Sequence, residues 1–367
     1  MPDRLSQFIY RLNHSYDGPA LLFDLTILKE RLQLLRELGD RYNCQFLMPV
    51  KAFRHSLIYQ LTGEVLWGFD ISNYNEYAGL PTPLTNKLVS LTDPAFDGYD
   101  LRLFLTKQNN FRIYIETTSQ AQKLQSQGVD FGIRLNSSSL LTTEDRNQTS
   151  DRYSRFGISN LTELAKIALS APDRFVGFHI HHGLYENCTD TILTFARQVI
   201  ALADQFQLPL PSIDLGGGLA EIGFLQLETL LIELRRLVRS PTVLIFEAGK
   251  LLFEDIGFAY GKVKSLQCDR CGWIVTLDLS KSCHLRWSVP QLIVPDSTTS
   301  ANQVPVSIYG ATCNEGDRLG EFLVPLHNVQ GCPYQEGDIV VFKNINCYSV
   351  SWNTSFNGIN PAEVKFF

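Results

Sequence analysis

Short apolar segments of strand length alternate with amphipathic segments from about residue 20 to residue 249. The apolar segments span 20–25, 45–50, 64–71, 87–92, 111–116, 131–136, 176–182, 212–218 and 243–249. Between several of them, apolar residues recur at three- and four-residue spacing, most clearly in 28–42, 191–206 and 227–238. Because parallel neighbouring strands need a crossover helix, this alternation favours a parallel sheet. About eight such units over roughly 230 residues predict an α/β fold of the (β/α)8 TIM-barrel type, with a doubly wound open sheet as the alternative.

The pattern changes near residue 255. Segments of strand length follow one another there, separated by turns and prolines, and helical periodicity nearly disappears; they span 261–267, 273–279, 291–296, 304–310 and 338–344. We therefore predict two domains, a barrel over 20–254 and a β-rich domain over 255–367. Residues 1–19 are expected to join the second domain.

Composition and charge narrow the function classes. The 367 residues carry a net charge of −6 without a block of like charge, which disfavours binding to nucleic acid or to an anionic membrane. No apolar run is long enough to span a bilayer, and the first residues lack the features of a signal peptide. Eight cysteines in a chain of this length indicate reduced thiols, so we expect a cytoplasmic protein.

Chemically active side chains close or follow the predicted barrel strands, at the end where barrel enzymes place their catalytic groups. These residues are Lys51, Asp70, Glu76, Arg134, His181, Gly216, Gly217, Gly218 and Glu247. Lys51 directly follows the apolar run FLMPV, where an unpaired amine is costly to bury. Such a lysine has a lowered pKa and can form a Schiff base. The alternative is a lysine whose stem is buried while its amine reaches solvent.

The triple glycine and the histidines each allow two interpretations. Backbone without side chains at 216–218 can approach a phosphate and offer N–H groups, or it can be a flexible turn. Glu247 is a carboxylate in an apolar setting, and its structural alternative is an ion pair with Lys250. His181 can stack on a planar ring. His179 shares one strand face with it, which leaves a metal site open.

Two groups stand out in the β-rich domain. Cys313 and Asp317 lie in the turn-rich segment GATCNEGD, where the thiol is either a catalytic acid or a small buried residue. The pair Cys268 and Cys271, followed by Cys283 and His284, is similar to a zinc ribbon. A structural zinc with four tetrahedral ligands is the alternative there, although we expect no metal at the active site.

Taken together and in this order, the motifs resemble the fold-type III pyridoxal-phosphate decarboxylases, the ornithine/diaminopimelate/arginine/carboxynorspermidine decarboxylase family. The resemblance covers nearly the whole chain. It is carried by PVKAF, GFDISNYNE, GIRLN, SRFGI, GFHIHHGLYEN, SIDLGGGL, FEAGK, CNEGDRLGE and YSVSWNTSFNG. It implies an alanine-racemase-like barrel with a C-terminal β domain, and pyridoxal 5'-phosphate as cofactor.

The resemblance also implies a role for each motif residue. Lys51 would bind the cofactor aldehyde as an aldimine, and the substrate would then replace it in an external aldimine that loses carbon dioxide. Catalytic roles fall to Lys51, Cys313 and His181. Cofactor-binding roles fall to Lys51, Asp70, Glu76, Arg134, His181, Gly216, Gly217, Gly218, Glu247, Lys250 and Tyr348. Substrate-binding roles fall to Cys313, Asp317, His284 and Arg286.

The expected substrate is a small-molecule amino acid of the carboxynorspermidine or diaminopimelate type, and the expected assembly is a homodimer in which Cys313 serves the partner's site. Glu186, Asn187 and the FNGIN ending most resemble carboxynorspermidine decarboxylase. Arg286 departs from that pattern, because an aspartate stands about there in the polyamine-type members. An arginine would attract an anion, so an anionic-tailed natural-product intermediate of the aminocarboxypropyl-nucleotide type is the alternative. An amino-acid racemase and a non-catalytic cofactor carrier are further alternatives.

Overall fold

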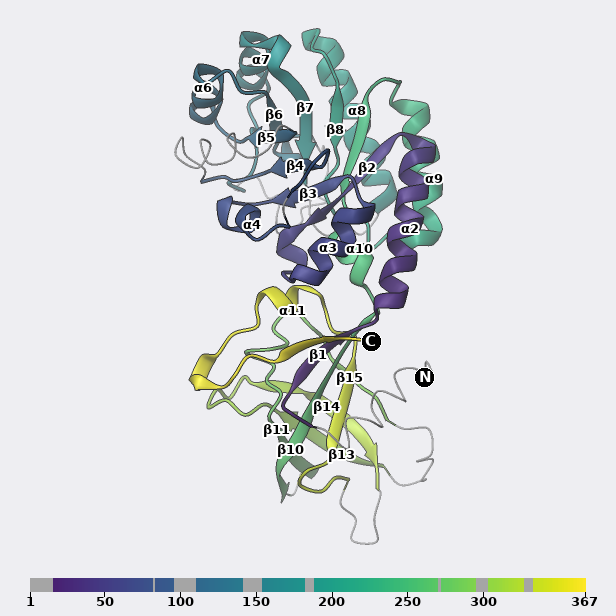
Figure 1. Cartoon of the computed structure of the whole chain (residues 1–367), viewed down its shortest axis with the longest axis vertical. Coiled ribbons are helices and arrows are strands. Elements are labelled where there is room, and N and C mark those ends of the chain that lie inside the picture. The colour runs from purple at the N-terminus through teal and green to yellow at the C-terminus, as the bar shows by residue number, and fades with distance from the viewer. Residues whose placement is uncertain are drawn as a thin grey trace. The chain divides into compact units, whose positions relative to one another are not determined.

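The computed structural model describes residues 16–81, 83–95, 110–140, 154–181, 188–269, 272–294, 303–326 and 333–367. The chain forms two compact units (Figure 1). Unit 2 consists of residues 30–252, and unit 1 combines the N-terminal residues up to Lys29 with residues 253–367. Glu186, Asn187 and Cys271 lie outside the described residues.

Unit 2 holds a closed barrel of eight parallel strands. These are β2 (Cys44–Pro49), β3 (Gly68–Ile71), β4 (Leu88–Leu91), β5 (Phe111–Ile115), β6 (Phe131–Leu135), β7 (Phe175–Ile180), β8 (Ser212–Asp214) and β9 (Val243–Glu247). Neighbours in this order pair in parallel, and β9 pairs with β2 to close the ring. The α/β barrel predicted from the alternating pattern is confirmed.

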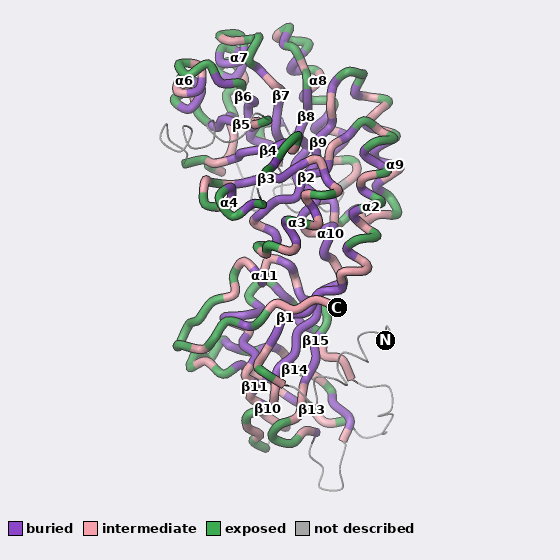
Figure 2. Tube along the Cα trace, viewed as in Figure 1, coloured by how far each residue is buried: buried purple, intermediate pink, exposed green. Residues whose placement is uncertain are grey.

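Helices surround the barrel (Figure 1). They are α2 (Leu25–Tyr42), α3 (Ser56–Val65), α4 (Tyr74–Ala78), α6 (Thr118–Ser126), α7 (Leu161–Ser170), α8 (Cys188–Phe206), α9 (Gly223–Leu237) and α10 (Gly249–Phe253), with short 3-10 turns at Val50–Ala52, Ser137–Ser139 and Pro172–Arg174. Figure 2 shows buried barrel strands and helices with buried and exposed sides. In α9 the buried residues Leu227, Leu230, Leu231 and Leu234 form one apolar stripe. The expected strand at 64–71 begins only at Gly68, because residues 64 and 65 complete α3.

The barrel interior has two layers of different chemistry. Side chains at partnered positions of parallel strands share a face. One layer is apolar and contains Leu47, Leu88 and Ile245, with Trp67 and Val243 packed against it. The other layer, nearer the carboxyl ends of the strands, is polar and buried; it contains Asp70, Ser90, Tyr114, His179, Asp214 and Glu247. TIM-barrel interiors are usually filled by bulky branched residues, so this polar layer marks the functional end.

Unit 1 is the predicted β-rich domain. Its strands are β1 (Ala20–Phe23), β10 (Gly257–Asp269), β11 (Gly272–Leu277), β12 (Gln291–Leu292), β13 (Gln303–Tyr309), β14 (Arg318–Pro325), β15 (Ile339–Lys343) and β16 (Glu363–Phe366). The strands β12-β15-β10-β11-β13-β14 follow one another in the sheet. The helix α11 (Tyr348–Ser351) and a 3-10 turn at Phe356–Gly358 follow β15.

One strand lies in a different sheet from the one expected. The segment at 20–23 was predicted to begin the barrel, but β1 pairs antiparallel with β10 and parallel with β16 in unit 1. All four of its residues are buried, and α2 begins two residues later, so locally it looks like a barrel unit. The barrel closes without it because β9 pairs with β2. No helix among the described residues has the length and apolar character needed to cross a membrane.

The barrel should depend strongly on the stacked pair Phe46 and Phe246, from the neighbouring strands β2 and β9. Both side chains are fully buried, with ring centroids 5.4 Å apart. We expect Phe46→Ala to lower the free energy of unfolding by about 3–5 kcal/mol, since it removes buried apolar surface and leaves a cavity. Urea denaturation measures the change. Leu225→Ala, at a side chain 98% exposed, is the control and should change stability by under ~0.5 kcal/mol. A Phe46→Ala loss no larger than the control's would contradict this account of the packing.

Candidate active site

Lys51 lies at the carboxyl end of β2, where the chain leaves the strand in a 3-10 turn (Val50–Ala52). Its Nζ lies 3.2 Å from Asp70 Oδ2 and 3.1 Å from Glu247 Oε2. The three side chains come from the ends of three neighbouring strands, β2, β3 and β9. The lysine side chain is 34% exposed, whereas both carboxylates are almost fully buried. The amine is therefore partnered by charge and still accessible, as a reacting amine must be.

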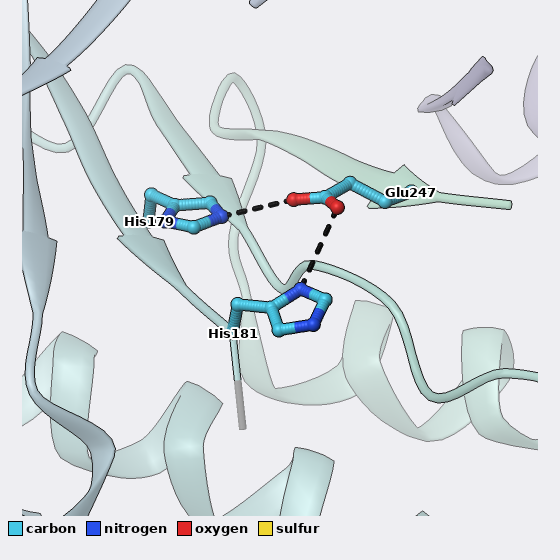
Figure 3. A group of neighbouring side chains, drawn as sticks. All are labelled: His179, His181 and Glu247. Carbon is cyan, nitrogen blue, oxygen red and sulfur yellow. Dashed lines mark hydrogen bonds and ion pairs between the residues drawn. The ribbon is translucent and has the colours of Figure 1, made fainter. Parts of the chain in front are cut away.

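Glu247 is contacted by two imidazoles as well as by the lysine (Figure 3). His179 Nε2 lies 3.0 Å from Oε1, and His181 Nδ1 lies 3.5 Å from Oε2. Burial by itself would raise the pKa of Glu247, but Lys51 and the two histidines together hold this pKa well below its usual range. Glu247 is therefore a buried carboxylate that stays anionic.

The other two buried carboxyls behave in the opposite way. Burial, and then the negative charge of Glu247, raise the pKa of Asp70 well above its usual range, with Lys51 opposing. The same two causes raise the pKa of Asp214 to about 7. Three carboxyls around one ammonium cannot all ionise cheaply, so protons are retained in this layer near neutral pH. The sequence analysis did not single out Asp214, although it stands two residues before the triple glycine.

The triple glycine after β8 is required by its close approach to His181. Gly216 has φ +64°, and a Cβ there would lie 2.8 Å from His181 Nδ1. The Gly217 N–H donates to that same nitrogen at 3.2 Å, and the Gly216 N–H donates to Asp214 Oδ1 at 3.0 Å. The loop thus fixes the imidazole and exposes a backbone without side chains beside it. Such a backbone can approach a phosphate.

Two predicted cofactor residues have structural partners. Glu76 accepts the Ser72 N–H at 2.7 Å, while Asn73 caps α4 by accepting the Glu76 N–H. Arg134 pairs with Glu116 at 2.9 Å. Glu116 also accepts the Gly157 N–H, so the SRFGI segment is joined to this ion pair. Glu116 was missed by sequence reasoning, although it is the last residue of the predicted strand at 111–116. Cofactor contacts of Glu76 and Arg134 stay predictions.

The alternative pairing of Glu247 with Lys250 is not the one observed. Lys250 Nζ lies 3.1 Å from Glu221 Oε1, and Glu247 pairs with Lys51 instead. Lys250 stands in α10, the helix that begins at Gly249, one residue after β9 ends. The structure therefore brings together Lys51, Asp70, His181, Gly216, Gly217 and Glu247 of the predicted set in unit 2.

The predicted residues of unit 1 form a second group. Cys313 is exposed, and its N–H donates to Asn357 Oδ1 of the FNG turn at 3.0 Å. Tyr348 opens α11, with its ring centroid 6.3 Å from that of Trp287. Arg286 is exposed and lies over the Trp352 ring at 5.3 Å. The CNEGD and FNG motifs, 44 residues apart between Cys313 and Asn357, are thus in contact.

Asp317 and His284 are buried and fully hydrogen-bonded. Asp317 accepts from the Ser280 hydroxyl, the Ser282 N–H and both the N–H and the hydroxyl of Thr312. His284 Nδ1 accepts the Ser280 N–H at 3.0 Å, so Nε2 carries the hydrogen and donates to the Asn360 carbonyl at 3.1 Å. These contacts organise the loop and leave the predicted substrate contacts of both side chains without support.

In both candidate metal sets, ring nitrogens already take part in hydrogen bonds. In unit 1, both His284 nitrogens are bonded, Cys268 is exposed and Cys283 is buried, so the described ligands of the zinc alternative do not assemble. In unit 2, ligand atoms of His179, His181 and Glu247 lie within 4.8 Å of one another. However, His181 Nδ1 accepts the Gly217 N–H, and His179 Nε2 faces a carboxylate oxygen and must carry a hydrogen there.

The same groups fit pyridoxal phosphate. The cofactor needs an amine for its aldehyde, a carboxylate for its ring nitrogen and a backbone able to approach its phosphate. Lys51, Glu247 and the loop at 216–218 offer these three groups at one end of the barrel. The buried Oδ1 of Asp70 and Oδ2 of Asp214 also lack a hydrogen-bond partner among the described residues, which is common where a ligand or water completes a site.

The chain has relatives over nearly its full length, although no family model matches it. It is 23% identical to a carboxynorspermidine/carboxyspermidine decarboxylase of Campylobacter jejuni, over 93% of this chain and 90% of the relative. It is 22% identical to a carboxyaminopropylagmatine decarboxylase of Synechocystis, over 95% of this chain and 89% of the relative.

Solved structures give the same result. The carboxynorspermidine decarboxylase of Campylobacter jejuni, complexed with norspermidine, matches with a TM-score of 0.75 and 21% identity, over 95% of this chain and 94% of that one. The arginine decarboxylase of Paramecium bursaria Chlorella virus, bound to agmatine, matches with a TM-score of 0.80 and 16% identity, over 100% of both chains. At these identities the likeness shows a shared fold. The predicted resemblance is confirmed: the proteins that the chain resembles are these decarboxylases, which are carbon–carbon lyases.

The raised pKa of Asp214 predicts a pH-dependent loss of stability. Because the folded chain binds this proton more tightly than the unfolded chain, the contribution is full near pH 4 and is lost as pH rises through about 7. Asp214→Asn keeps an acceptor for the Gly216 N–H but cannot ionise. We expect its free energy of unfolding, relative to the wild type, to rise by roughly 2–4 kcal/mol between pH 4 and pH 8. Urea titrations of the cofactor-free proteins measure this, and parallel curves for the two would refute it.

Proposed function

We propose that the chain is a pyridoxal-phosphate-dependent decarboxylase, acting on the α-carboxylate of a carboxynorspermidine- or diaminopimelate-like amino acid. The observation that carries this proposal is the Lys51 amine between Asp70 and Glu247, beside a glycine loop at the carboxyl ends of barrel strands. The two decarboxylase relatives support the reaction class, because the similarity to this chain covers 90% and 89% of their lengths.

Each residue of the site has a chemical task in this proposal. When bound, pyridoxal phosphate supplies an aldehyde that condenses with amines and a ring that takes up the electron pair left by departing carbon dioxide. Glu247 stays anionic, so it can hold a proton on the ring nitrogen opposite it. His181, fixed by the Gly217 N–H, supplies a flat face for packing. The loop at 216–218 supplies the backbone approach for a phosphate.

Asp70 exchanges a proton with the amine of Lys51 in this proposal. Its Oδ2 lies 3.2 Å from Lys51 Nζ, within reach of direct proton transfer. Lys51 must give up a proton before it can act as a nucleophile. The raised pKa of Asp70 brings the carboxyl closer to the amine in proton affinity, so a proton can pass between the two atoms at a low energetic cost.

Cys313 is proposed as the acid that protonates the former α carbon. It is an exposed thiol whose backbone is held by Asn357, so its loop is ordered by the FNG turn. The resemblance implies that this loop serves the active site of the partner subunit, and we therefore propose a homodimer with a small-molecule amino acid as its substrate. Tyr348, Lys250, Arg134 and Glu76 remain proposed cofactor contacts.

A second candidate substrate has an anionic tail. A cavity of about 540 Å³ in unit 1 is lined by Lys281, Ser282, Arg286, Asn314, Gly316, Thr354 and Phe356. Two of these described lining residues are basic and none is acidic. An ammonium tail would find no carboxylate in that lining, whereas a carboxylate or phosphate tail would find a guanidinium. This observation favours an anionic natural-product intermediate of the aminocarboxypropyl-nucleotide type as the alternative.

The cofactor proposal is tested by covalent trapping. We expect borohydride reduction of the protein with pyridoxal phosphate to leave a modification on Lys51, located by peptide mass spectrometry. Lys51→Ala should lose the modification and lower turnover about a thousandfold or more, because the reacting amine is gone. Lys166→Ala, at an exposed lysine of α7, is the matched control and should keep the label on Lys51. Labelling elsewhere, or of no lysine, would disprove the proposal, and α-hydrogen exchange without carbon dioxide release would indicate a racemase instead.

The substrate tail is tested through Arg286. We expect carbon dioxide release from carboxynorspermidine, and a KM lowered about two- to five-fold by Arg286→Ala, because an exposed cation near an ammonium is worth at most ~1 kcal/mol. Mass spectrometry of the product and steady-state kinetics measure both. A wild type inert toward carboxynorspermidine but active on an anionic-tailed amino acid, with KM raised by Arg286→Ala, would replace the first substrate class by the second.

A further inference from the structure

His179 is a buried imidazole that the proposed reaction does not use. It lies on β7, at the register position between Arg134 of β6 and Asp214 of β8. Its side chain is 1% exposed, so it cannot reach a substrate in solvent. Its Nε2 lies 3.0 Å from Glu247 Oε1, which is the shorter of the two imidazole contacts to that carboxylate. Figure 3 shows the two histidines on different oxygens of Glu247.

The surroundings of His179 determine its tautomer. A ring nitrogen that faces a carboxylate oxygen at hydrogen-bond distance must carry a hydrogen, so Nε2 is the donor. Nδ1 is buried and has no hydrogen-bond partner among the described residues. Protonating Nδ1 would bury an unpaired N–H. Burial, reinforced by Arg134 and His181 and opposed by Glu247, lowers the pKa of His179 to about 4.

A neutral donor affects Glu247 differently from a cationic one. Lys51 neutralises the carboxylate by contributing a charge, whereas His179 orients it and leaves its charge intact. The Lys51 contact would also be lost in the proposed reaction, because its amine would have to move away from Glu247 to condense with the cofactor aldehyde. His181 is the weaker partner of the carboxylate, because its Nδ1 lies 3.5 Å from Oε2 and also lies 3.2 Å from the Gly217 nitrogen. His179 is then the donor that remains on Oε1.

We propose that His179 is a positioning residue for Glu247: its neutral Nε2–H fixes one carboxylate oxygen and leaves the other for the cofactor ring nitrogen. This inference rests on the proposed function, because it assigns Glu247 to the cofactor ring. The hydrogen-bonded partners of metal ligands give the scale, because removing one typically costs 10–100-fold in metal affinity or activity.

Three variants of His179 separate positioning from packing. Gln places its amide N–H about where Nε2 lies, whereas Asn is too short to reach Oε1. Phe keeps the ring volume but has no donor. We expect His179→Gln to bind pyridoxal phosphate within about threefold of the wild type, and His179→Asn and His179→Phe to bind about 10–100-fold more weakly. The pKa of the bound cofactor's ring nitrogen, followed by 15N NMR of labelled pyridoxal phosphate, should fall by about one unit in Asn and Phe, since a poorly placed carboxylate holds the ring proton less well.

A double-mutant cycle with Glu247 completes the test. If His179 acts through the carboxylate, His179→Asn should change cofactor affinity less than about threefold in a Glu247→Gln background. Equal affinities and spectra for the Gln and Asn variants, or full additivity with Glu247→Gln, would overturn the proposal. The Gln and Asn pair carries the comparison even where the Phe variant fails to fold. A wild type that binds no pyridoxal phosphate would refute the proposed function, whereas loaded wild type with unaffected variants would refute the role of His179 alone.

Discussion

The buried negative charge of Glu247 is the constraint on which the functional end of the barrel depends. An isolated carboxylate at that depth would take up a proton to avoid the cost of burial. Here Lys51 supplies a positive charge on Oε2 and His179 a neutral donor on Oε1, so the charge is retained. Burial and the nearby charge of Glu247 together raise the pKa values of Asp70 and Asp214, so these two carboxyls ionise less readily.

The barrel interior keeps the polar groups of the site in one layer and the apolar packing that stabilises the barrel in another. The apolar layer built on Leu47, Leu88 and Ile245 supplies burial without charged groups. The polar layer lies nearer the carboxyl ends of the strands, where loops such as 216–218 follow directly. In unit 1, buried Asp317 plays a comparable organising part, because its four hydrogen bonds order the turn that carries Cys313. In each unit a buried carboxylate therefore holds a more accessible reactive residue in place: Glu247 holds Lys51, and Asp317 holds the turn that carries Cys313.

Sequence reasoning succeeded where chemistry follows a strand end. Lys51, Asp70, His181 and Glu247 each close or follow an apolar run, so their convergence follows from parallel strands ending at one edge. His179 and Asp214 carried weaker signals, because a side chain within a strand looks like any core residue until its neighbours are known. The partners of Lys250 and Glu247 were also ambiguous, since both stand within three residues of each other and only the fold selects Glu221 and Lys51.

The sequence by itself determined the α/β barrel, the β-rich second unit and the order of the motif residues, because periodicity and strand ends are local properties of the chain. Tertiary structure alone decided the sheet to which β1 belongs, since a fully buried strand carries no mark of its partners. It also decided which carboxyls ionise. Proton affinity depends on burial and on charges from other strands, and residues far apart in the chain supply those charges only after the barrel closes.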